Sequence, residues 1–407
     1  MGTLEKYLAS YAERETCLVP PLPPHTWDEA VVVPIHAEGT NVLDLLDSLA
    51  RASRSKNLAI LVINGRRDQD EAVHRTNHDL IQQLKNYPVI QGSNPLWFLA
   101  YAPRLDILLI DKASPGFRFQ EKEGVGLARK IGSDLAVQLY LKGILKSACI
   151  HTTDADAIVD EDYFVFEQDP DVGAFLHPFR HDPNELPLQL YDRSLRYYVA
   201  GLKYAQSPYA FHTIGSTISF HAKAYAMVRG FPNTVAAEDF YFLNKMAKVA
   251  KIKELSEAGV LLTHRPSNRV PFGTGVAVTK IKKASNELKV YHPMSFELLR
   301  SWLTFCSELG GALPEAITPI LERMGAFQAL AIARATRRTC DDIRRHMHTW
   351  FDAFQTLKFI HAVRDELLPL VPISSQGSPA LFSHHSPYGP VPAPLLHIFS
   401  SLTHNPD

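Results

Sequence analysis

The sequence predicts an α/β fold with a doubly wound, mostly parallel sheet, followed by a helical appendage. Short apolar runs that do not alternate with polar residues predict buried parallel strands. Amphipathic patterns at helical spacing separate these runs, which is the order expected of strand–helix–strand crossovers. After about residue 285, long helical patterns continue without strand-like runs, and they predict the appendage.

The first expected crossover begins with residues 30–35 (AVVVPI), a short β-branched run. Val42, Leu45, Leu46 and Leu49 then recur at helical spacing. A second strand of the same type is expected at residues 58–63 (LAILVI). The spacing therefore predicts a right-handed crossover between two neighbouring parallel strands.

The alternation continues through the next two hundred residues or so. It predicts a strand at 107–110, a helix over about 124–141 and a short strand at 148–153 that ends at Asp154. From about 171 to 263 strands and helices still alternate. The expected organisation is a leader at 1–29, an α/β domain at 30–284, helices at 285–367 and an extended Pro/Ser-rich tail at 368–407.

Composition and charge exclude several classes of protein. The 407 residues carry a formal net charge of -1, which argues against a dedicated nucleic-acid binder. The four cysteines form no C-x-x-C pair, so a thiolate metal site is not expected and a reducing compartment suits the chain. No apolar run reaches the roughly 18 residues of a membrane span, and the acidic N-terminus does not resemble a signal peptide. The predicted location is the cytoplasm.

Asp154 and Asp156 are the strongest candidates for chemistry, because they follow an apolar strand in the sequence TTDADA. Carboxylates at this spacing can share one Mg²⁺ or Mn²⁺, whose remaining positions go to phosphate oxygens. In parallel sheets ligands bind beyond the carboxyl ends of the strands, so residues 36–39, 64–68 and 154–156 are expected to border one crevice. The alternative is that these aspartates only serve a solvated turn or a helix cap.

Five stretches together resemble the GT-A fold glycosyltransferases of the family-two type, over about residues 30–275. They are VVVPIHAEGTNVLDLLDSL, VINGRRD, GVGLARKIGSDLAV, TTDADAIVD and GSTISFHAKAYAMVRGFPNTVAAED. Their order and spacing make the resemblance more specific than any one motif. It implies that the 30–284 domain is a GT-A catalytic domain.

The resemblance implies donor-binding roles for residues in the first three stretches. Pro34, His36 and Glu38 are expected beside the nucleoside. Asn64 stands where the family usually has an aspartate that reads the base, so the base stays open. Arg129 and the metal ligand Asp154 are expected to reach the donor.

The later stretches imply the acceptor side of the site. Asp239 is expected to be the general base that takes the proton from the acceptor hydroxyl, with Glu238 positioning the acceptor. His264 is the candidate third metal ligand. Arg265 and Arg269 are expected to clamp the diphosphate or an anionic acceptor.

The resemblance thus implies a metal-dependent, hexosyltransferase-like enzyme that moves a sugar from a UDP- or GDP-sugar to the hydroxyl of a small molecule or glycan. One alternative is a nucleotidyltransferase, which would need a glycine-rich basic loop where this chain has HAEGTN. The other is a catalytically inactive relative that binds a partner through its helical appendage. The sugar, the acceptor, the stereochemistry and the oligomeric state stay open.

Overall fold

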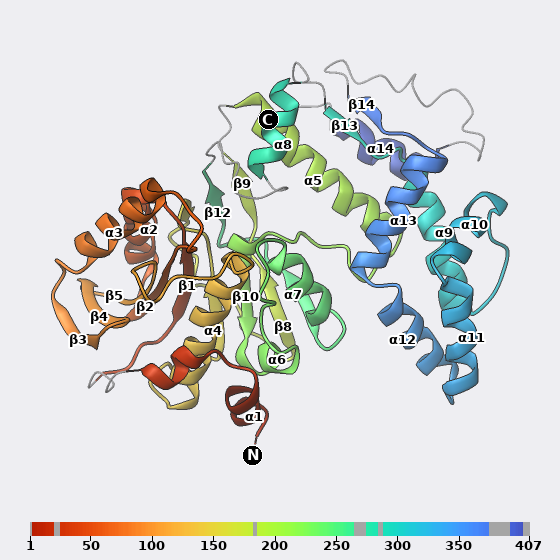
Figure 1. Cartoon of the computed structure of the whole chain (residues 1–407). Coiled ribbons are helices and arrows are strands. Elements are labelled where there is room, and N and C mark those ends of the chain that lie inside the picture. The colour runs from red at the N-terminus through yellow and green to blue at the C-terminus, as the bar shows by residue number, and fades with distance from the viewer. Residues whose placement is uncertain are drawn as a thin grey trace. The chain divides into compact units, whose positions relative to one another are not determined.

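The computed structural model describes residues 2–19, 25–181, 185–263, 274–283, 288–373 and 391–401. The chain forms two compact units, coloured along the sequence in Figure 1. The first consists of Met1–Asp182 and Thr213–Arg265, and the second of Pro183–His212 and Pro266–Asp407.

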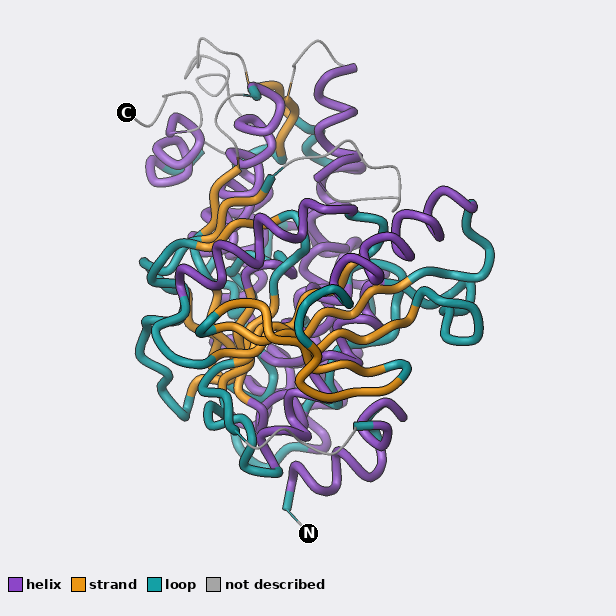
Figure 2. The backbone as a smooth tube through the Cα atoms, turned by 90° about the vertical axis from the view of Figure 1, so that its left-hand side faces the viewer, coloured by secondary structure: helices purple, strands orange, loops and turns teal. Residues whose placement is uncertain are grey.

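A nine-stranded sheet forms the centre of the first unit, with its strands side by side in orange in Figure 2. Its order is β11-β8-β10-β6-β1-β2-β5-β4-β3, and in this described sheet only β4 and β10 run against the other strands. This confirms the predicted mostly parallel α/β sheet. The strands are β1 (Ala30–Ile35), β2 (Asn57–Asn64), β3 (Val89–Ser93), β4 (Leu96–Ala102), β5 (Leu105–Lys112), β6 (Cys149–Thr152), β8 (Val172–Leu176), β10 (Ile218–His221) and β11 (Lys251–Glu254).

Helices cover both faces of this sheet, because alternate residues of each strand point to opposite sides. Val31 and Val33 of β1 join one core cluster with the helical residues Leu45 and Leu49, whereas Val32 meets the helix on the other face. The helices of the first face are α2 (Val42–Ala52) and α3 (Glu71–Leu84). Those of the second are α4 (Val125–Leu141), α6 (Ala222–Met227) and α7 (Glu238–Met246).

The close approach of α4 to the sheet depends on Gly132. A Cβ atom added there would lie 2.4 Å from Cγ1 of Val32 and 3.2 Å from Cγ2 of Val62. We expect Gly132→Ala to destabilise the protein by about 1–3 kcal/mol, since overpacking outweighs the better helix propensity of alanine. Urea unfolding measures this effect, and a variant as stable as the wild type would contradict the close packing.

The N-terminal residues are a structural part of the first unit rather than a separate leader. They form α1 (Thr3–Ser10) and the 3-10 helix η1 (Arg14–Leu18). The Tyr7 hydroxyl donates to Oδ1 of Asp134 at 2.5 Å, and Lys130 Nζ donates to the Tyr7 hydroxyl at 3.1 Å. These buried bonds tie α1 to α4.

The sequence predicted neither the edge hairpin of β3 and β4 nor two of the three strands of a second, smaller sheet, whereas the third of these falls in the alternation expected up to residue 263. The hairpin of β3 and β4 lies at the sheet edge, where β3 keeps only half-buried and exposed residues and so has no continuous apolar run. A second, three-stranded sheet consists of β7 (Ala157–Val159), β12 (Val260–Leu262) and β9 (Phe179–His181). Strands of three residues are too short to give a periodic signal.

The second unit is mainly helical, with its own core around the buried side chains of Trp302, Phe296 and Phe359. Helix α5 belongs to this unit, although it is embedded in the sequence of the α/β domain. Its helices are α5 (Leu186–Tyr204), α8 (Thr274–Lys283), α9 (Met294–Glu308), α10 (Thr318–Arg323), α11 (Ala326–Thr336), α12 (Cys340–Trp350), α13 (Ala353–Glu366) and α14 (Ala393–Ser401). The described residues also form short 3-10 helices, η2 (Gly39–Asn41) and η3 (Gly215–Thr217) in the first unit and η4 (Glu315–Ile317) in the second.

The expectation of an extended tail is wrong for part of residues 368–407. Strand β14 (Val371–Ile373) pairs antiparallel with β13 (Leu288–Val290). Helix α14 buries Leu395 and Phe399 in the core of the second unit. The apolar sequence LLHIF explains the difference. Burial of these side chains stabilises a packed helix, although the proline-rich composition of the whole segment predicts an extended chain. In the described ranges, no helix combines the length and apolar character needed to cross a membrane.

Candidate active site

Three of the predicted site segments follow neighbouring strands. Strand β1 pairs in parallel with both β2 and β6. The carboxyl ends of these strands therefore meet at one edge of the sheet. His36 follows β1, Asn64 ends β2 and Asp154 lies just beyond β6, as their positions in the chain predict.

A pair of asparagines joins the ends of β1 and β2. Asn64 is 3% exposed, and its Nδ2 donates to the carbonyl of Ile35 at 2.9 Å. Asn77 of α3 donates through Nδ2 to the Asn64 carbonyl at 3.0 Å and accepts from the Ala37 amide at 2.8 Å. Asn77 carries no motif in the sequence, so its bridging role could only be found in three dimensions.

The other residues expected beside a nucleoside also lie at this edge. Pro34 is buried within β1, and Glu38 directly precedes η2. Nε2 of Gln69 lies 2.5 Å from Nε2 of His36. This contact joins His36, after β1, to the loop that follows β2.

Arg129 of α4 lies at the centre of the candidate site and is only 1% exposed. Its Nη2 donates to Oδ1 of Asp154 at 2.7 Å, and its Nε donates to Oε1 of Glu238 at 3.1 Å. Its Nη1 donates to the Thr152 hydroxyl and, at 3.1 Å, to the carbonyl of Gly215. Burial by itself lowers the pKa of Arg129, but the charges of Asp154 and Glu238 raise it by more, so the guanidinium stays charged.

The two aspartates beyond β6 occupy a tight turn. The Ala157 amide donates to the Asp154 carbonyl at 3.1 Å, and the Thr263 hydroxyl donates to the Asp156 carbonyl. The Asp154 side chain is 41% exposed, although one of its oxygens pairs with Arg129. It therefore reaches both the buried guanidinium and the solvent.

Glu238 and Asp239 form the first turn of α7, after Ala237 in a left-handed conformation with φ of 61°. Oδ2 of Asp239 accepts from the Gly215 amide at 2.9 Å, and its Oδ1 accepts from the Phe240 amide at 2.7 Å. Burial, with the charge of Glu238 as the next cause, raises the pKa of Asp239 to about 7. Burial also raises the pKa of Glu238, and the charge of Arg129 opposes that shift.

The charges of this cluster fit a divalent cation. One guanidinium faces the carboxylates of Asp154 and Glu238, and Asp239 is linked to it through Gly215. Negative charge is therefore in excess. Within the described ranges, no group of three His, Cys, Asp or Glu side chains could hold a metal by itself. A cation here needs further oxygens from a ligand, and Mg²⁺ is commonly bound by one or two carboxylates together with phosphate oxygens.

The raised pKa of Asp239 predicts a pH-dependent cost in stability. The ordinary pKa of this carboxyl is 3.8, so between about pH 4 and 7 the unfolded chain loses its proton while the folded chain keeps it. The contribution of Asp239 to the free energy of unfolding is thus largest below pH 4 and is lost as the pH rises to about 7. In the presence of chelator, we expect the melting temperature of Asp239→Asn to rise relative to that of the wild type as the pH increases over this range. Each kcal/mol of difference in the free energy of unfolding should shift the melting temperature by about 2–4 °C.

Differential scanning calorimetry from pH 4 to 8 measures this difference. The difference should grow up to about pH 7 and then level off. A difference that stays constant over the whole range would contradict the raised pKa of Asp239.

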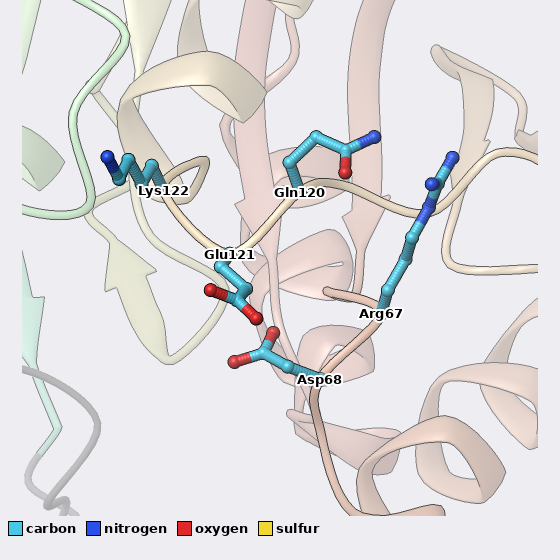
Figure 3. Close-up of a pocket in the computed structure, with 5 residues that line it drawn as sticks. All are labelled: Arg67, Asp68, Gln120, Glu121 and Lys122. Carbon is cyan, nitrogen blue, oxygen red and sulfur yellow. The ribbon is translucent and has the colours of Figure 1, made fainter.

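A pocket of about 440 Å³ lies between the loops that follow β2 and β5. Figure 3 shows the carboxylates of Asp68 and Glu121 pointing toward each other, with Arg67, Gln120 and Lys122 directed away from them. Asp68 pairs with Arg66, and this hydrogen bond lowers the pKa of the Asp68 carboxyl. Both loops leave the carboxyl ends of parallel strands, so the pocket belongs to the same edge of the sheet.

Four of the predicted site residues are connected by hydrogen bonds, and three others lie outside the described residues. Arg129, Asp154, Glu238 and Asp239 form one connected cluster. His264, Arg265 and Arg269 lie outside the described residues, and their roles stay predictions. The sequence analysis did not single out Thr152 or Gly215, although both lie within stretches that carry the resemblance.

No family model and no curated protein matches the chain. Among solved structures it is similar to S. aureus TarS 1-349, with 14% identity, a TM-score of 0.36 and coverage of 79% of this chain and 91% of that chain. It is also similar to a mannosyltransferase, PcManGT from Pyrobaculum calidifontis in complex with GDP-Man and Mn²⁺, with 15% identity, a TM-score of 0.35 and coverage of 89% and 94%. A third is GalNAc-T7 with UDP, GalNAc and Mn²⁺, with 11% identity, a TM-score of 0.33 and coverage of 75% and 56%. At these identities and TM-scores the similarities do not assign a function to this chain.

Proposed function

We propose that the protein is a metal-dependent glycosyltransferase that moves a sugar from a nucleoside diphosphate to an acceptor hydroxyl. The observation that carries this proposal is the cluster in which Arg129 binds both Asp154 and Glu238, next to Asp239. It combines carboxylates suited to a divalent cation with a carboxylate suited to proton transfer. The five stretches that resemble the family-two glycosyltransferases support the same chemistry.

Asp239 is the proposed general base. A base works best when its pKa lies near the working pH, and burial brings the pKa of Asp239 to about 7. The amides of Gly215 and Phe240 fix the direction of its carboxylate. Glu238, held by Arg129, is proposed to orient the acceptor beside it.

The donor is proposed to lie along the edge formed by β1, β2 and β6. Its nucleoside would lie near Pro34, His36, Glu38 and Asn64, beside the pocket of Figure 3. Asp154 and Asp156, with His264 as a proposed third ligand, would hold Mg²⁺ or Mn²⁺, which when bound supplies positive charge to the departing diphosphate. Arg265 and Arg269 are proposed to bind the diphosphate or an anionic acceptor.

Thermal shift with a panel of UDP- and GDP-sugars, with and without Mn²⁺, tests the proposal. A ligand that binds only the folded state raises the melting temperature. We expect one nucleotide class to do so only with Mn²⁺, and we expect Asp156→Ala to abolish the shift.

Glu161→Gln is a matched control, because Glu161 is an exposed acidic residue shortly after the same turn. It should keep the full shift. If no nucleotide sugar stabilises the wild type with Mn²⁺, the glycosyltransferase proposal is wrong, and the partner-binding alternative gains support.

A further inference from the structure

We infer that Arg129 is a positioning residue that locks the donor-side and acceptor-side carboxylates of the site into one unit. The inference rests on the proposed function, which assigns Asp154 to the metal and Glu238 and Asp239 to the acceptor. This role differs from direct contact with the donor, because the guanidinium is buried and its hydrogen bonds to Thr152, Asp154, Gly215 and Glu238 go to groups of the protein.

The shape of the guanidinium explains how one side chain can do this. Its donors lie in a fixed plane, so their directions cannot change independently. Nη2 binds Asp154 at 2.7 Å and Nε binds Glu238 at 3.1 Å. The positions of these two carboxylates are therefore coupled, although 84 residues (238 − 154) separate them in the chain.

Gly215 extends this coupling to Asp239. Its carbonyl accepts from Nη1 of Arg129 at 3.1 Å, and its amide donates to Oδ2 of Asp239 at 2.9 Å. A Cβ atom at Gly215 would lie 2.7 Å from Nη2 of Arg129 and 3.5 Å from Oδ2 of Asp239. An alanine at this position would displace the guanidinium without changing a charge.

The surroundings of the guanidinium support a positioning role. The Phe231 ring packs 5.9 Å from its central carbon, and the Thr152 hydroxyl accepts from Nη1. Hydrogen bonds to a metal-binding carboxylate fix its orientation, and losing such a bond typically costs 10–100-fold in metal affinity or activity. Arg129 would thus act on the reaction through Asp154 and Glu238.

Two variants test the inference, Arg129→Lys and Gly215→Ala. Lysine keeps the charge but lacks the planar fork, and alanine at 215 displaces the fork but keeps Arg129. Gly310→Ala is the matched control, because an added Cβ there meets no atom within 4 Å. Each protein is titrated with Mn²⁺, alone and with UDP or GDP, and binding is followed by the electron paramagnetic resonance signal of the free ion.

We expect Arg129→Lys and Gly215→Ala to weaken Mn²⁺ binding by about 10–100-fold and to lower kcat by a similar factor. Gly310→Ala should match the wild type. In an Asp154→Asn background, Arg129→Lys should cost no further Mn²⁺ affinity, because Arg129 acts on the ion through Asp154. A role in folding alone would lower the melting temperature and leave Mn²⁺ affinity unchanged.

The outcomes separate this inference from the proposed function. If the wild type and Asp156→Ala both fail to bind Mn²⁺, the proposed function is wrong and the inference fails with it. If the wild type binds Mn²⁺ and Asp156→Ala does not, but folded Gly215→Ala binds like Gly310→Ala, only the inference is overturned. If Arg129→Lys does not fold, the Mn²⁺ affinity of Gly215→Ala by itself tests the positioning role of Arg129.

Discussion

Asp239→Asn is expected to lower kcat by about 10²–10⁴-fold, the usual contribution of a general base. The amide of asparagine has nearly the shape of the carboxyl group, but its single oxygen can accept from only one of the Gly215 and Phe240 amides, so the melting temperature of the variant is measured beside its rate. The asparagine amide cannot take a proton at neutral pH. Donor binding should change little, because Asp239 is proposed to act on the acceptor.

The measurement is steady-state transfer with the donor identified by thermal shift, together with the donor Kd of the variant. Asp341→Asn is a suitable control, since Asp341 also lies in the first turn of a helix but belongs to the second unit. It reports any general effect of removing a charge from a helix N-terminus. Transfer by Asp239→Asn within a few-fold of the wild type would exclude Asp239 as the base.

Removing the metal is expected to have an effect of comparable size. A cation that neutralises a leaving diphosphate contributes several kcal/mol in the transition state, so chelator should lower the rate by about 10²–10³-fold or more. Asp156→Ala and Asp154→Asn should reproduce this loss at ordinary concentrations of Mn²⁺. Asp154→Asn should also destabilise the protein, because it removes one of the charges that compensate the buried Arg129.

Transfer rates with increasing Mn²⁺ or Mg²⁺ after chelation measure the dependence. Glu161→Gln should need no more metal than the wild type, whereas Asp156→Ala should need much more or not recover. A rate that does not respond to chelator would contradict the metal-dependent mechanism, even if nucleotide binding is confirmed.

The central strands could be predicted from the sequence because their physical signal is local. β1, β2 and β5 are buried along their full length, and burial on both faces requires continuous apolar runs. The edge hairpin of β3 and β4 has no such run, and its pairing depends on β5 beside it. Helix α5 lies within residues 171–263, where helices and strands were expected to alternate, but its apolar face does not show which core it joins.

The edge of the sheet at which the acidic groups of the candidate site lie could be predicted from the sequence. Asp154 and Asp156 follow a buried strand, and its carboxyl end lies at the same edge as those of β1 and β2, because the three strands run in parallel. The hydrogen bonds of Arg129, in contrast, could be identified only in three dimensions. Its bonds reach Asp154, Gly215 and Glu238 across 25 to 109 residues of chain, and such contacts leave no periodic pattern in the sequence. They form because a buried guanidinium must satisfy its donors with whatever groups the packed helices and strands bring within reach.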